Sequence, residues 1–101
     1  GDSMKLWEYL ACARPVVATA GEGYGDTVER LGAGLSVKEE DPVALAEVVL
    51  RVLRDPASAR KMGQAGRVAV VHCHTWDARA MELEQVCRVA AAEYVRDRVC
   101  A

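Results

Sequence analysis

The chain has 101 residues, of which 51% are hydrophobic, and its formal net charge is −2 at pH 7. This length suits one domain or a piece of one, with enough apolar side chains for a small core. The slightly acidic balance argues against a nucleic-acid partner or a general anionic-membrane surface. No apolar run is long enough for a transmembrane segment, and Gly1–Lys5 does not resemble a secretion signal.

The first two predicted elements are a helix over residues 3–13 and a short strand over residues 15–19. Leu6, Leu10 and Ala13 lie three or four residues apart and can share one helical face. Pro15 ends this pattern, because proline biases the preceding residue away from the helical region. The β-branched run that follows is typical of a strand covered on both faces of a parallel sheet.

Residues 20–26 form a loop with glycines at alternate positions, namely Gly21, Gly23 and Gly25. This spacing is not the dinucleotide-binding fingerprint, which requires G-x-G-x-x-G. The loop is therefore either a flexible turn or a segment that contacts a ligand. A short helix over residues 26–31 should follow and end at a glycine-containing turn, before a second strand over residues 35–37.

Three longer helices are predicted over residues 42–54, 57–71 and 76–97. Asp-Pro pairs at positions 41–42 and 55–56 are strong helix starts, and Thr75 can cap the last helix. Each helix has a predicted packing face. These faces consist of Leu45, Val49, Val52 and Leu53; of Met62, Ala65 and Ala69; and of Trp76, Ala80, Leu83, Cys87, Ala90 and Tyr94.

Alternation of helices and strands predicts an α/β fold with parallel strands. Two strands alone cannot form a parallel sheet that is buried on both faces. We therefore expect a three-layer Rossmann-like half-domain, with a short parallel sheet and a helical C-terminal part. Its first half would lie elsewhere.

The segment 5–19, K-L-W-E-Y-L-A-C-A-R-P-V-V-A-T, resembles the donor-site segment of the group-1 retaining glycosyltransferases of GT-B fold. The resemblance continues through Gly34–Val37, Asp41–Glu47, Met62–Arg67 and Thr75-Trp76. It implies that residues 1–101 form a single unit, the second half of a C-terminal domain that binds a nucleotide sugar.

The resemblance also implies a site. The family has two glutamates eight positions apart, and the second, which accepts hydrogen bonds from the nucleotide ribose, corresponds to Glu8. The first would lie one position before Gly1. The turn between them, which includes Ser3 and Met4, would present backbone amides to the donor diphosphate, with Lys5 as a nearby cation. Without the resemblance, Glu8 and Lys5 would be interpreted as solvated side chains.

Three residues of the strand end and loop are further candidate donor contacts: Thr19, Gly21 and Gly23. The corresponding family loop often has the sequence G-G-x-P-E, and here Gly23 matches its second glycine. Ala13 stands where the family usually has a glycine. If this position is left-handed, alanine costs about 1 kcal/mol.

The function implied by the resemblance is binding of a nucleoside-diphosphate sugar and participation in hexosyl transfer to an acceptor. No catalytic residue is identifiable, no cofactor is expected beyond the donor substrate, and the chain is not expected to be active alone. Its expected partners are an N-terminal domain or companion chain, or a second copy when isolated. The alternative is a non-catalytic assembly module that uses the last helix.

The cysteines and histidines do not indicate a metal site. Cys12, Cys73, Cys87 and Cys100 contain no C-x-x-C pair, so free thiols in a reducing compartment are expected. His72-Cys73-His74 places three ligand types side by side, which rarely chelate one ion. A turn before the last helix is the expected role of this triplet. The predicted location is cytoplasmic, peripheral to the membrane in an intact enzyme.

Overall fold

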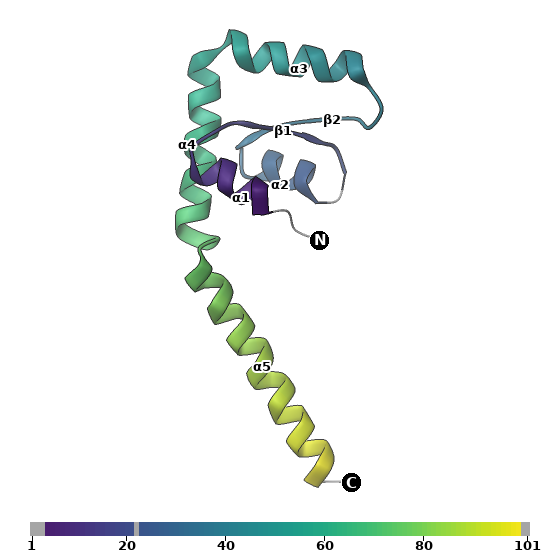
Figure 1. Cartoon of the computed structure of the whole chain (residues 1–101), viewed down its shortest axis with the longest axis vertical. Helices are drawn as coiled ribbons and strands as arrows, with labels where there is room; N and C mark the ends of the chain where they lie inside the picture. The colour runs from purple at the N-terminus through teal and green to yellow at the C-terminus, as the bar shows by residue number, and fades with distance from the viewer. Residues whose placement is uncertain (1–3, 22, 100–101) are drawn as a thin grey trace.

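The computed structural model describes residues 4–21 and 23–99. Its elements in chain order are α1 (Met4–Ala11), β1 (Val16–Thr19), α2 (Tyr24–Arg30), β2 (Gly34–Val37), α3 (Pro42–Arg54), α4 (Pro56–Cys73) and α5 (Trp76–Val99), as Figure 1 shows. The predicted order of helices and strands is confirmed. The bounds of the described elements differ from the predicted ones by at most two residues: α1 ends at Ala11 instead of residue 13, α2 begins at Tyr24 instead of residue 26, and α4 and α5 each end two residues later than predicted.

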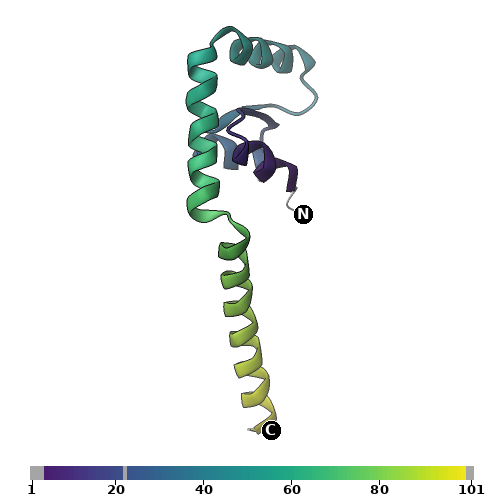
Figure 2. The same cartoon turned by 60° about the vertical axis from the view of Figure 1, so that its left-hand side comes forward.

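β1 and β2 form a parallel pair with Val16 opposite Gly34 and Thr19 opposite Val37. Helix α3 lies on one side of this sheet, and α1 and α2 lie on the other (Figures 1 and 2). The predicted α/β fold with a short parallel sheet and a helical C-terminal part is therefore confirmed. None of the four residues of β1 is fully buried, although a strand covered on both faces was predicted. This sheet has only two strands among the described residues, so one edge of β1 has no neighbouring strand.

The buried core is small and lies where α1, α2 and the turn before β2 meet. Among the described hydrophobic residues, Leu6, Leu10, Val28 and Ala33 are the buried ones. Half-buried side chains complete this core, namely Trp7, Val16, Ala18, Tyr24, Leu31 and Val70. The α1 face predicted from Leu6 and Leu10 is thus confirmed, whereas Ala13, predicted on the same face, lies beyond the end of α1 in a left-handed conformation.

Two glycines allow α4 to pack closely on α1. Gly63 and Gly66 are the buried residues of α4, and a Cβ at Gly63 would lie 2.0 Å from the Ala13 carbonyl oxygen. Arg67, one residue beyond Gly66, donates a hydrogen bond to the Ala11 carbonyl oxygen at the C-terminal end of α1. The α4 face predicted from Met62, Ala65 and Ala69 is half-buried, as expected.

The caps predicted at Asp41, Asp55 and Thr75 are confirmed, and Ala13 is in the left-handed region. Asp41 accepts from the Ala44 amide at 2.9 Å, and Asp55 accepts from the Ser58 amide at 3.0 Å. Thr75 accepts from the Ala78 amide at 3.2 Å. Ala13 has a φ of 53°, the left-handed conformation that glycine adopts more easily.

The predicted packing face of α3 is wrong. No residue of α3 is buried, and Leu45, Val49 and Leu53 are all exposed. The half-buried residues are Ala44, Val48 and Val52, which lie four residues apart along the helix. The side of α3 that faces the body is therefore not the centre of its apolar side. The two described strands cover only part of the apolar side of this helix.

The predicted face of α5 is not packed against the body. Helix α5 extends away from the body in both views (Figures 1 and 2), and every one of its residues from Arg79 to Val99 is exposed. Apolar residues also occupy the opposite side of the helix, namely Met81, Val89, Val95 and Val99. Helix α5 thus has no single apolar stripe, and the body covers neither side.

Candidate functional site

The N-terminal turn of α1 lies beside the C-terminal end of β1, because α1 and β1 run in opposite directions (Figure 1). A groove of about 490 Å³ opens between them. Its lining comes from α1, β1, the first residue of α2 and the loops after β1 and β2, and consists of Lys5, Leu6, Tyr9, Val16 to Gly21, Tyr24 and Glu39. We call this the strand-end groove. Ligands of open α/β sheets bind at this end of the strands.

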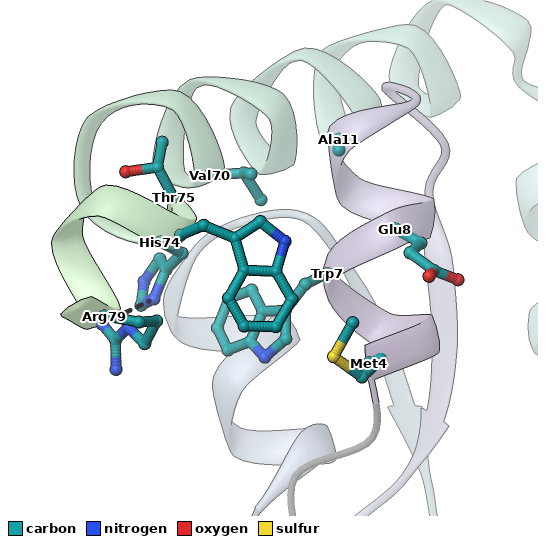
Figure 3. Close-up of a pocket in the computed structure, with 9 residues that line it drawn as sticks. Met4, Trp7, Glu8, Ala11, Val70, His74, Thr75 and Arg79 are labelled. Carbon is teal, nitrogen blue, oxygen red and sulfur yellow. Dashed lines mark hydrogen bonds between the residues drawn. The ribbon is translucent and has the colours of Figure 1, made fainter. Parts of the chain in front are cut away.

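A second groove, of about 470 Å³, lies between α1 and the junction of α4 with α5. We call it the junction groove (Figure 3). Its lining is mostly apolar and aromatic, and consists of Met4, Trp7, Glu8, Ala11, Val70, His74, Thr75, Trp76 and Arg79. The two grooves therefore flank the first turns of α1.

Glu8 is exposed, and Figure 3 shows its carboxylate on the side of α1 that faces away from His74. Within residues 4–21 and 23–99, this carboxylate has no hydrogen-bond or ion-pair partner. Lys5 is also exposed, but it lines the strand-end groove. The structure therefore brings Lys5 together with Thr19 and Gly21, and places Glu8 at the edge of the junction groove.

The junction groove contains a contact that the sequence did not suggest. The rings of Trp7 and His74 are stacked, with centroids 4.1 Å apart and an interplanar angle of 21°. Arg79 approaches His74 Nδ1 with its Nη2 at 3.4 Å and donates to the Cys73 carbonyl oxygen at 3.2 Å. Burial, and next the Arg79 guanidinium, lower the pKa of His74 below its ordinary value of 6.5.

The model of the family described as "Glycosyl transferases group 1" matches residues 2–69. The chain belongs to this glycosyltransferase family. A solved structure, sucrose-phosphate synthase from Thermosynechococcus elongatus, matches with 37% sequence identity and a TM-score of 0.82. The match covers 91% of this chain and 23% of that one, so the chain spans about a quarter of the synthase. No curated protein matches the chain.

The family resemblance inferred from segment 5–19 is therefore confirmed, and so is the GT-B-like fold. The expected donor contacts of this glycosyltransferase chain stay predictions. Met4 and Lys5 begin α1, whereas Ser3 and the cap expected from Asp2 or Ser3 lie outside the described residues.

The loop after β1 is held near the strand end by its glycines. Gly21 and Gly23 have φ values of 123° and 125°, which side chains rarely adopt. Gly25 is buried, and a Cβ there would lie 2.2 Å from the Thr19 carbonyl oxygen. The alternate glycines are thus explained by the backbone conformation and by close packing. Gly21 also lines the strand-end groove.

The triplet 72–74 forms the end of α4 and the start of the junction instead of a separate turn. His72 and Cys73 belong to α4, and His74 is its C-cap. Within the described part of the chain, no three His, Cys, Asp or Glu side chains converge as metal ligands would. Among the described residues, no helix combines the length and the apolar character needed to span a bilayer.

Proposed function

We propose that this chain supplies the nucleotide-binding side of a glycosyltransferase that uses a nucleoside-diphosphate sugar. The observation that carries the proposal is the position of the first turn of α1 at the C-terminal end of β1, with Lys5, Thr19 and Gly21 on one groove. This is the edge of an α/β sheet at which ligands bind. Family membership supports the donor class.

The diphosphate is assigned to the N-terminal end of α1. The first amides of a helix have no intrahelical acceptor, and the helix dipole favours an anion at this end. Lys5 adds a full positive charge on the groove side. Residues 3 and 4 contribute backbone amides in this proposal, with Gly21 and Gly23 as backbone contacts from the loop. The chemistry supplied is electrostatic stabilisation of the leaving diphosphate.

The ribose is assigned to Glu8. Its carboxylate is exposed and has no partner among the described residues, so it can accept hydrogen bonds without breaking an existing ion pair. Glu8 lies one turn from the start of α1, and in this proposal the ribose lies at that turn, beside the diphosphate. The hexosyl acceptor and the rest of the active site would come from other parts of an intact enzyme, and we expect no transfer by this chain alone.

Glu8→Gln tests the ribose assignment. The amide keeps the shape of the side chain but removes the charge, so each hydrogen bond to the ribose weakens. We expect UDP or GDP to bind the unmodified chain, and the substitution to weaken that binding by about 1–3 kcal/mol. Isothermal titration calorimetry with each nucleotide measures the change.

Glu47→Gln is the matched control, because Glu47 is also an exposed helical glutamate but lines neither groove. It should leave nucleotide affinity unchanged. Equal affinities for the parent chain and Glu8→Gln would refute the ribose contact. If neither UDP nor GDP bound to the parent chain, nucleotide binding by this chain would be refuted altogether.

A further inference from the structure

The junction between α4 and α5 is short and closely held. Only His74 and Thr75 separate the last residue of α4 from the first residue of α5. The His74 amide donates to the Val70 carbonyl oxygen at 3.0 Å, and Thr75 caps α5. Any change in the direction of α5 relative to the body must therefore take place at these two residues.

The side chain of His74 joins three elements at this junction. Its ring stacks on Trp7 of α1, it follows directly on α4, and its Nδ1 lies 3.4 Å from Arg79 Nη2 of α5. The same Nη2 donates to the Cys73 carbonyl oxygen at the end of α4 (Figure 3 shows the residues of the groove). The first turn of α5 is thus tied both to α4 and to the imidazole.

The contact with Arg79 fixes the protonation state that this geometry requires. A guanidinium has donors and no acceptor, so His74 Nδ1 must supply a lone pair, and the ring proton must lie on Nε2. Adding a second proton converts Nδ1 into a donor that faces another donor. It also places two cations about one hydrogen-bond length apart, which is repulsive.

The charges around His74 do not compensate fully for this repulsion. Arg79 and Arg30 disfavour the imidazolium, and Glu82 favours it. Glu82 is already paired with Arg79 Nη1 at 2.9 Å, and the Glu8 carboxylate points away on the outer side of α1. Burial is the largest of the effects that lower the pKa of His74. The stack on Trp7 opposes these effects, since a cation over an indole ring is attracted to it.

We propose that the α4–α5 junction is a pH-sensitive latch, which fixes the direction of α5 while His74 is neutral and releases it when His74 binds a proton. In the released form, Arg79 of α5 no longer contacts the imidazole of His74. It keeps its hydrogen bond to the Cys73 carbonyl oxygen at the end of α4. Helix α5 then adopts a wider range of orientations relative to the body. Acidification therefore changes the positions in which its exposed apolar residues can contact a partner.

The pH window follows from the direction of the pKa shift. Above pH 6.5 His74 is mostly neutral whether the latch is closed or open, and the latch is fully stable. Below that value the open form takes up the proton first, so closure weakens as the pH falls. The closed latch loses no further stability once the pH is below the lowered pKa of His74, because His74 is then protonated in both the closed and the open form.

The first measurement is a titration of His74 by NMR of the imidazole carbon signals in a His72→Asn chain, which leaves a single histidine. We expect a midpoint below 6.5. Arg79→Met keeps an apolar side chain of similar length but removes the charge, and it should raise the midpoint. A midpoint above 6.5 in the parent, or one unmoved by Arg79→Met, would overturn the proposal.

The second measurement follows the direction of α5. Cys12 and Cys87 are exposed on the body and on α5, so spin labels there report the distance between them once Cys73→Ser and Cys100→Ser remove the other thiols. An excess of unlabelled chain keeps the labels of separate copies apart. We expect a narrow distance distribution at about pH 7.5 and a broader, shifted one at about pH 5.

His74→Phe keeps a ring that can stack on Trp7 but cannot be protonated, so its distance distribution should be the same at both pH values. Arg79→Met should likewise abolish the pH response, and because Arg79 is exposed, this substitution should leave the fold intact. A response that persists in either variant, or a parent distribution that is the same at both pH values, would show that His74 does not control α5.

Discussion

Gly63→Ala is expected to lower the free energy of unfolding by at least about 3 kcal/mol, a large part of the stability of a small domain. A Cβ at this position would lie 2.0 Å from the Ala13 carbonyl oxygen and 2.7 Å from its carbon. Both are backbone atoms and cannot rotate away, so α4 must move off α1. That movement removes the contact of Arg67 with Ala11 and exposes Leu10.

Helix propensity alone predicts the opposite sign, because alanine is about 1 kcal/mol better than glycine inside a helix. Gln64→Ala, at the neighbouring exposed position of α4, is the matched control and should be neutral or slightly stabilising. Urea unfolding, followed by the helix signal in circular dichroism at about 222 nm, gives the free energy of unfolding of both variants. A Gly63→Ala chain as stable as the parent would show that α4 is not held at this distance from α1.

The features that the sequence predicted well are local. Pro15 ends a helix whatever surrounds it, and Asp41 and Asp55 cap helices through amides three residues away. The left-handed conformation of Ala13 agrees with the glycine that the family usually has at this position. Such features depend on a few neighbouring residues, so they can be inferred without knowledge of the rest of the fold.

The packing faces of α3 and α5 could not be inferred in this way. Periodicity shows which side of a helix is apolar, but burial depends on what lies opposite. Among the described residues, the sheet beneath α3 has only two strands, which leaves Leu45 and Leu53 exposed. In α5, the choice of one stripe ignored apolar residues such as Met81 and Val95 on the other side.

The glycines of α4 and the Trp7–His74 stack were missed for a related reason. Gly63 and Gly66 matched the family pattern, but a helix interior gives no local sign that its glycines meet another backbone. Trp7 and His74 are far apart in the sequence, and the packing of α1 on α4 brings their rings together. Contacts of this kind follow from tertiary structure.

The candidate donor site rested on the family resemblance more than on the residue pattern. Without it, Glu8 and Lys5 are ordinary exposed helical charges, and the structure shows both to be exposed. What the structure adds is the shared groove of Lys5 with Thr19 and Gly21, at the end of the sheet where ligands bind. The sequence could not show that Glu8 lies at the edge of a different groove.

The purified chain is expected to associate with itself through α5, unless another polypeptide covers this helix. Trp76, Leu83 and Tyr94 are 72%, 64% and 58% exposed, and each buried side chain of this kind gains about 1.5–3 kcal/mol. Tryptophan and tyrosine are also the residue types that most often anchor protein interfaces. Sedimentation velocity at micromolar concentration should therefore show a dimer or larger species.

Replacing Trp76, Leu83 and Tyr94 together with glutamine should convert that species to a monomer, because a loss of about 1.5 kcal/mol or more at each of the three side chains raises the dissociation constant at least about a thousandfold. The matched control replaces apolar residues of the opposite side of α5 with glutamine: Met81, Val89 and Val95, which are 71%, 48% and 58% exposed. If the Trp76 side is the contact, the control sediments like the parent. If the opposite side is the contact, the control variant sediments as a monomer and the variant at Trp76, Leu83 and Tyr94 sediments like the parent. A parent chain that sediments as a monodisperse monomer and unfolds cooperatively would refute self-association, and would show that the small core around Leu10 and Val28 suffices without a partner.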